Sequence, residues 1–180
     1  MNDIASGDLG PWLSPDDLES VRRKVPMVYV TAVPVRLDTD GTVESIGALL
    51  RASDVDGTLQ REVVSGRVLV HETLRAALTR HLERDLGPLC FPQLPPNLVP
   101  FTVAEFFPIP GAAGHHDSRQ HAVALCYVVP VGGECTPQRD VLELSWLTPR
   151  DLRDPDLLDE FVDGHAAVVR QALAHCGRLV

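Results

Sequence analysis

Arg80, His81, Arg84 and Asp85 form the short polar stretch best suited to chemistry. Residues three to four positions apart are neighbours on a helix, so Arg80 and Arg84 share one side and His81 lies near Asp85. An imidazole can ligate zinc, nickel or iron or transfer a proton near neutral pH, and a guanidinium binds phosphate-like anions. A carboxylate is a ligand that magnesium prefers. We therefore take His81, Arg84 and Asp85 as candidate catalytic residues.

A wider spacing pattern surrounds this stretch. A glycine is followed after five residues by a glutamate and after seven more by an arginine, and the framework residues are Gly66, Glu72, Arg80, Leu82, Asp85 and Gly87. This spacing resembles the box of the Nudix hydrolases, G-x5-E-x7-R-E-U-x-E-E-x-G-U, in which U is a bulky apolar residue. At the three acidic positions in the core of that box, this chain has His81, Arg84 and Asp85.

In that family, glutamates of the box hold magnesium or manganese against a diphosphate, and water then attacks phosphorus. The resemblance implies this cofactor here, with Asp85 and His81 as the candidate metal ligands. His81 suits magnesium poorly and Arg84 brings a permanent positive charge, so we expect a divalent ion to bind far more weakly than in an active member. The resemblance also implies that Glu72 and Arg80 pair to hold the preceding loop to the helix.

Two interpretations stay open for His81 and for Arg84. His81 is either a ligand, acid or base in an altered pocket, or a residue without function on a helix that no longer takes part in catalysis. Arg84 either contacts an anion directly, where the metal of the family bridges phosphate, or is a solvated surface charge. Arg80 and Arg84 are the candidate groups of the helix for binding a small anionic or nucleotide-like molecule.

A second polar cluster lies in a predicted loop over residues 110–119. His115 and His116 are further candidate ligand-binding residues, and Asp117 and His121 lie close to them in sequence. Imidazoles and a carboxylate can bind zinc, but the spacing matches no strong zinc pattern, so an exposed polar loop is the alternative. If this loop folds over the box helix, His81 joins the cluster. Family members often draw one more acid from a later loop, and the candidates here are Glu134, Asp140 and Glu143.

The composition of the 180 residues narrows the class of protein. Hydrophobic residues make up 44% and charged residues 23%, which is typical of one globular domain. The net charge of -9 argues against non-specific nucleic-acid binding. No apolar run approaches the roughly 20 residues that span a bilayer, and the first residues lack the pattern of a signal peptide, so we expect a cytoplasmic protein without a membrane partner. The four cysteines form no C-x-x-C pair, which favours free thiols.

Periodicity and turn residues predict the order of the elements. Ser14 and Pro15 indicate the start of a helix that runs to about Lys24. Strands are predicted over 25–38, 43–51 and 58–64, and the first two form a hairpin. Leucines at every fourth position predict a helix over 72–86, which ends at Gly87. Further strands are predicted over 101–109, 120–131 and 141–146, and further helices after 148 and over 163–174.

This order predicts an α/β (α+β) fold and resembles the Nudix-type sandwich, a mixed β-sheet packed between helices. We expect residues 1–24 to be an N-terminal extension with a short helix, and residues 25–180 to be a single Nudix-like domain. The whole chain is also similar to a group of actinobacterial Nudix-like proteins of unassigned function. Members of the family are often dimers, so the resemblance implies a homodimer.

Two classes of function follow. The first is a divergent hydrolase or an enzyme of altered chemistry that acts on a diphosphate or nucleotide-like molecule with weak or no magnesium dependence. The second is a non-catalytic Nudix domain that binds a small ligand or a partner protein as a regulator. The framework of the box favours the first class. The replacement of acids by His81 and Arg84 favours the second.

Overall fold

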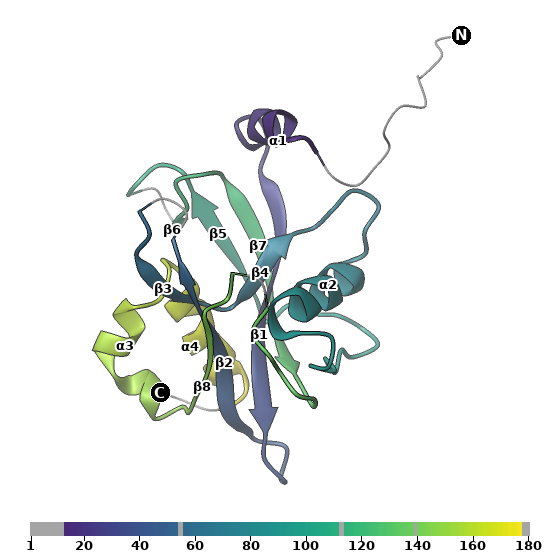
Figure 1. Ribbon diagram of the computed structural model, residues 1–180, viewed down its shortest axis with the longest axis vertical. Helices are drawn as coiled ribbons and strands as arrows, with labels where there is room; N and C mark the ends of the chain where they lie inside the picture. Colours follow the sequence, from purple (N-terminus) through teal and green to yellow (C-terminus); the bar gives the residue numbers. More distant parts are fainter. Residues whose placement is uncertain (1–12, 54–55, 112–113, 139, 178–180) are drawn as a thin grey trace.

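Figure 1 shows the computed structural model, which describes residues 13–53, 56–111, 114–138 and 140–177. Within these residues, eight strands form one mixed sheet. The strands are β1 (Met27–Leu37), β2 (Val43–Ala52), β3 (Leu59–Glu62), β4 (Val64–Arg67), β5 (Thr102–Phe107), β6 (His115–His116), β7 (Ala122–Pro130) and β8 (Glu143–Leu147). The helices are α1 (Pro15–Arg22), α2 (Leu74–Leu86), the 3₁₀ turn η1 (Asp151–Arg153), α3 (Pro155–Asp159) and α4 (His165–His175).

Strand β1 lies at the centre of the sheet. The strand order is β3-β2-β1-β7-β5-β6, while β4 pairs with β1 and β8 pairs with β2. The predicted hairpin is confirmed, because β1 and β2 are antiparallel with Val35 opposite Ile46. Strand β7 lies parallel to β1 along its length, from Met27 opposite Ala122 to Val35 opposite Pro130. Strands distant in sequence are thereby brought side by side.

Helices cover both faces of this sheet (Figure 1). Helix α2 packs on one face, where Leu78, Leu82 and Leu86 join the core formed with Val30 and Leu49. The other face packs against residues of α3 and α4 in a separate core. Full burial of one leucine side chain contributes on the order of 2 kcal/mol, so the leucine stripe of α2 fixes the helix against the sheet. The predicted sandwich of a mixed sheet between helices is confirmed.

The ends of α2 follow the sequence signals. The Thr73 hydroxyl accepts a hydrogen bond from the Ala76 amide at 3.2 Å and so caps the first turn. Gly87 ends the helix with a φ of +88°, a left-handed value that favours glycine. The predicted helix near the N-terminus is also confirmed, with Ser14 as the cap of α1.

Three details of the sequence prediction are wrong. The strand predicted over 58–64 is two strands, because the chain leaves β2 at Val63 and then pairs with β1 as β4. The Val63 amide donates instead to His165 Nδ1 at 3.2 Å. The predicted loop over 110–119 contains β6, which pairs in parallel with β5. The strand predicted over 141–146 begins at Glu143.

Candidate functional site

The start of the box is held together by the predicted Glu72–Arg80 pair. Arg80 Nε and Nη2 each lie 2.7 Å from a Glu72 carboxylate oxygen. The same carboxylate accepts a hydrogen bond from the Leu69 amide at 3.0 Å, and Arg80 also donates to the Arg67 carbonyl at 3.0 Å. The hydrogen bond from Arg80 lowers the pKa of Glu72. Arg80 is a candidate ligand-binding residue, but these hydrogen-bond donors hold the loop to the helix.

His81 lies on the buried side of α2. Its side chain is buried, and its Nε2 lies 3.0 Å from the Arg67 carbonyl. Desolvation by burial lowers the pKa of His81 to about 4, so the imidazole is neutral near pH 7. Its Nδ1 is buried and has no hydrogen-bond partner among the described residues. His81 therefore packs against β4, and its proposed role as acid, base or ligand stays a prediction.

Gly66 explains how an imidazole fits there. Gly66 lies inside β4 and does not have a left-handed backbone, so no turn requires this glycine. A Cβ atom at this position would lie 1.9 Å from His81 Cε1. The glycine is needed for the space that the ring occupies.

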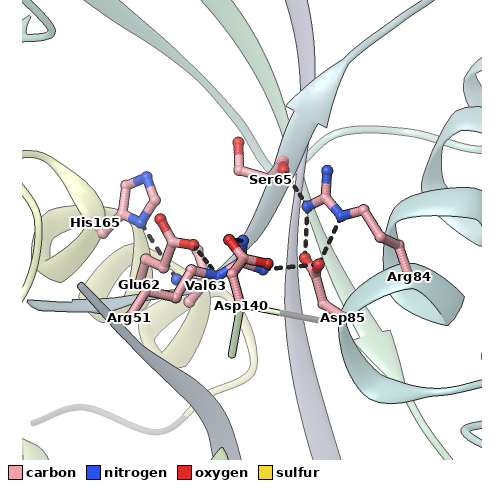
Figure 2. Close-up of polar contacts among 8 residues, drawn as sticks. All are labelled: Arg51, Glu62, Val63, Ser65, Arg84, Asp85, Asp140 and His165. Carbon is pink, nitrogen blue, oxygen red and sulfur yellow. Dashed lines mark hydrogen bonds and ion pairs between the residues drawn. The ribbon is translucent and has the colours of Figure 1, made fainter. Parts of the chain in front are cut away.

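Asp85 is also buried, with 1% of its side chain exposed. Arg84 donates to both carboxylate oxygens, from Nε to Oδ1 and from Nη2 to Oδ2, each at 2.6 Å. Arg84 Nη2 also donates to the Ser65 carbonyl at 3.0 Å, which ties α2 to β4 (Figure 2). The two neighbours in sequence thus form a bidentate ion pair. Arg84 is 26% exposed, so this pair lies at the solvent boundary of the site.

Arg51 of β2 brings three carboxylates together, as Figure 2 shows. Its Nη2 lies 2.7 Å from Asp85 Oδ1 and its Nε lies 2.8 Å from Glu62 Oε1. Its Nη1 lies 2.8 Å from Asp140 Oδ2. The partners come from α2, from β3 and from the segment before β8. One guanidinium therefore links three parts of the chain that are distant in sequence.

Electrostatics follow from this arrangement. Burial raises the pKa of Glu62, while the charge of Arg51 opposes the shift. Burial also acts to lower the pKa of Arg51, but Glu62 and Asp85 outweigh it and the net shift is upward. Fully ionised, the group carries two positive and three negative charges, on Arg51 and Arg84 and on Glu62, Asp85 and Asp140.

This donor set does not fit magnesium or manganese, the cofactor that the resemblance implies. Both oxygens of Asp85 are bonded to guanidinium groups, and His81 Nε2 faces a backbone carbonyl. Among the described residues, no three or more His, Cys, Asp or Glu side chains are arranged to hold a metal ion. A divalent ion would have to displace two arginines before it reached Asp85.

The histidines after β5 lie at another part of the fold. His115 packs against Gly164 at the start of α4, and its Nδ1 lies 3.9 Å from Asp163 Oδ1. The amide of His116 donates to Asp163 Oδ2 at 2.9 Å. The loop thus packs against α4, and the contacts of His81 are with β4, so the suggested joining of His81 to this cluster is not the observed arrangement. Ligand binding by His115 and His116 stays a prediction.

Sequence reasoning missed two members of the site. Arg51 and Glu62 are absent from the candidates, although a charged residue near the end of the apolar strand over 43–51 was a usable signal. Asp140 is one of the three candidate acids of the later loop, and the sequence does not distinguish it from the other two. The other two, Glu134 and Glu143, are exposed, and Glu143 accepts a hydrogen bond from Ser145. The pairing of β2 with β3 brings Arg51 and Glu62 together, and the packing of α2 on the sheet brings Asp85 to Arg51.

Two simpler predictions can be compared with the structure. All four cysteines are free thiols, and burial raises the pKa of Cys90 and Cys126 to about 11. In the described part of the chain, no helix is both long and apolar enough to cross a membrane.

Comparison with known proteins places the chain in a family. A family model described as a domain of unknown function, DUF4916, matches residues 8–178. A solved protein from Jonesia denitrificans, described as a possible asymmetric diadenosine tetraphosphate hydrolase, is 51% identical; the match covers 87% of this chain and 98% of that chain, with a TM-score of 0.84. No curated protein matches the chain.

More distant structures show the fold alone. The Nudix domain of NrtR from Shewanella oneidensis, solved with ADP ribose, is 17% identical with a TM-score of 0.60, and the match covers 91% of this chain and 93% of that chain. A Nudix hydrolase from Nitrosomonas europaea is 12% identical with a TM-score of 0.61, and the match covers 86% and 92% of the two chains. The resemblance that the box spacing indicated is confirmed: the chain has the Nudix fold and belongs to the DUF4916 family of domains of unknown function.

Proposed function

We propose that this protein binds a small anionic, nucleotide-like ligand at the exposed side of Arg84 and does not hydrolyse it by the metal-dependent route of the Nudix hydrolases. The observation that carries the proposal is the state of Asp85, the one acid kept in the core of the box. Its two oxygens accept hydrogen bonds at 2.6 Å from Arg84, and Arg51 also contacts Oδ1 at 2.7 Å. A carboxylate held in this way is not available to a divalent ion.

The distribution of charge favours Arg84 as the group that meets the ligand. Glu62 and Asp140 contact Arg51, whereas the carboxylate partner of Arg84 is Asp85. If a phosphate replaces Asp85 as the partner of Arg84, Asp85 keeps its contact with Arg51, and the positive charge of Arg51 still compensates its negative charge. The exchange replaces one charge-assisted pair by another, so it costs much less than exposing an unpaired buried carboxylate.

The class of ligand is supported by proteins of similar structure. The NrtR domain of the same fold was solved with ADP ribose, and the Jonesia protein is described as a possible diadenosine tetraphosphate hydrolase. Both molecules carry phosphate groups bridged to adenosine. A guanidinium matches two phosphate oxygens at once, which supports Arg84 as the recognition group.

The test measures the affinity for ADP ribose and for diadenosine tetraphosphate by calorimetry in EDTA. The wild-type protein should bind one of them without a divalent ion. Asp85→Asn should bind it more tightly, because a neutral amide competes for Arg84 less strongly than a carboxylate does. Arg84→Gln should bind it about tenfold more weakly or worse, as expected for a lost charge-assisted hydrogen bond. Arg153 is an exposed arginine of η1, and Arg153→Gln is the matched control, which should bind the ligand with the affinity of the wild type.

A requirement for magnesium, or weaker binding by Asp85→Asn, would overturn this proposal. That outcome would favour a second candidate function, hydrolysis of a dinucleoside polyphosphate. The similarity to the Jonesia protein, at 51% identity, is the observation in its favour. Turnover of diadenosine tetraphosphate with magnesium or manganese that disappears in Asp85→Asn would establish it. The same substitution thus has opposite effects under the two functions.

A further inference from the structure

The guanidinium of Arg51 has a carboxylate on each of its three nitrogens. Glu62 lies on Nε at 2.8 Å, Asp85 on Nη2 at 2.7 Å and Asp140 on Nη1 at 2.8 Å. The three acids come from different segments, and Figure 2 shows them converging on the guanidinium from different sides. Carboxylates repel one another, so this convergence depends on the positive charge at its centre.

A hard divalent cation is also bound by carboxylate oxygens, although here each carboxylate contacts a different nitrogen of Arg51 and, among the described residues, no three acids are placed to hold an ion together. Here the centre is a covalently attached group that carries a single permanent charge. Arg51 is enclosed by these partners, with 17% of its side chain exposed, whereas Asp140 is 66% exposed and opens the site to solvent. The position therefore has a cation of its own and a route by which another cation could reach it.

We propose that Arg51 is the resident cation of this site, a built-in replacement for a divalent ion at the junction of Glu62, Asp85 and Asp140. The inference rests on the proposed function in one respect, that the site works without a divalent ion. It goes beyond that function because it names Arg51 as a second arginine, beside Arg84, that excludes the metal, and it names the acids that would bind one. Two of these acids, Glu62 and Asp140, lie outside the box.

Removal of the guanidinium should turn the junction into a metal site. Arg51→Ala removes the cation that Glu62 and Asp140 contact, while Asp85 keeps its bidentate bond to Arg84. A divalent ion held by Glu62 and Asp140 beside Asp85 restores the lost positive charge. Manganese is the probe because it accepts carboxylate oxygens and its binding can be followed by electron paramagnetic resonance. We expect Arg51→Ala to bind Mn²⁺ at least about tenfold more tightly than the wild-type protein. We also expect Mn²⁺ to raise the melting temperature of Arg51→Ala but not that of the wild type.

A matched control is available on the neighbouring strand. Arg61 of β3 is similarly enclosed, with 15% of its side chain exposed, but it pairs with one carboxylate, Glu160, at 2.7 Å. Arg61→Ala should gain no affinity for Mn²⁺. Arg51→Lys should also lose the contact with all three acids, because a lysine ammonium is a single point charge and cannot present three nitrogens to three carboxylates. We expect its Mn²⁺ affinity to lie between those of the wild type and Arg51→Ala.

Equal Mn²⁺ affinity in folded Arg51→Ala and in the wild type would overturn the inference. If Arg51→Ala is unfolded in EDTA, recovery of its circular dichroism spectrum with Mn²⁺ supports the inference, and no recovery at any Mn²⁺ concentration overturns it. These readouts contain no nucleotide. Gain of Mn²⁺ binding in Arg51→Ala, with no nucleotide binding by the wild type, would therefore remove the proposed function and keep the inference.

Discussion

Replacing Gly66 with alanine tests how α2 packs on β4. The added Cβ would lie 1.9 Å from His81 Cε1 and 2.3 Å from both ring nitrogens. Atoms do not approach so closely, so the imidazole must leave its place. His81 cannot move freely, because it is buried and its Nε2 is bonded to the Arg67 carbonyl at 3.0 Å.

The cost has two parts. Overpacking a well-filled core costs about 1–3 kcal/mol. The displaced imidazole also loses its hydrogen bond, which contributes about 1 kcal/mol. The Arg67 carbonyl keeps its bond from Arg80 at 3.0 Å, so the larger penalty for an orphaned acceptor does not apply. Gly66→Ala should therefore lower the free energy of unfolding by about 2–4 kcal/mol.

A double-mutant cycle with His81→Ala gives the decisive measurement. His81→Ala removes the ring and leaves space, so the methyl group of Gly66→Ala should fit in the double variant. Urea denaturation should show that Gly66→Ala adds little or no cost when His81 is already alanine. Additive effects within about 0.5 kcal/mol would refute the packing described for this pair.

Three other predictions concern stability and are measured by urea denaturation. Burial lowers the pKa of His81 and of His165 to about 4, below the value of about 6.5 in the unfolded chain, so their contribution to the free energy of unfolding should be fully present above pH 6.5 and should fall as the pH is lowered towards 4. His81→Gln should reduce this fall, and the same dependence of stability on pH in the variant and the wild type would contradict the prediction. Glu72→Gln should cost about 2 kcal/mol through loss of its arginine pair, and an unchanged midpoint would argue against that bond. Thr73→Ala should cost about 1 kcal/mol because it removes the cap, whereas Thr79→Ala, inside the same helix, should cost less.

The sequence was sufficient for features that depend on local chemistry. The leucine repeat from Leu74 to Leu86 predicted the helix, and Gly87 predicted its end, because both signals act within a few residues. The spacing of Gly66, Glu72 and Arg80 led to the correct fold, and the pair between Glu72 and Arg80 was implied by the same resemblance. The hairpin over 27–52 followed from β-branched residues on either side of a turn.

The tertiary structure decided how the candidate residues are used. His81 and Asp85 are polar, but the space left by the missing side chain of Gly66 and the cations of Arg51 and Arg84 make their burial favourable. The bidentate bond of Arg84 to its own neighbour depends on side-chain conformation, which sequence spacing does not determine. Arg51 and Glu62 lie together because β2 pairs with β3, and they meet Asp85 because α2 packs on β1 and β4 of the same sheet; such long-range contacts leave no local signal. The sequence therefore identified the helix that carries the site, and the sheet decided which charges surround it.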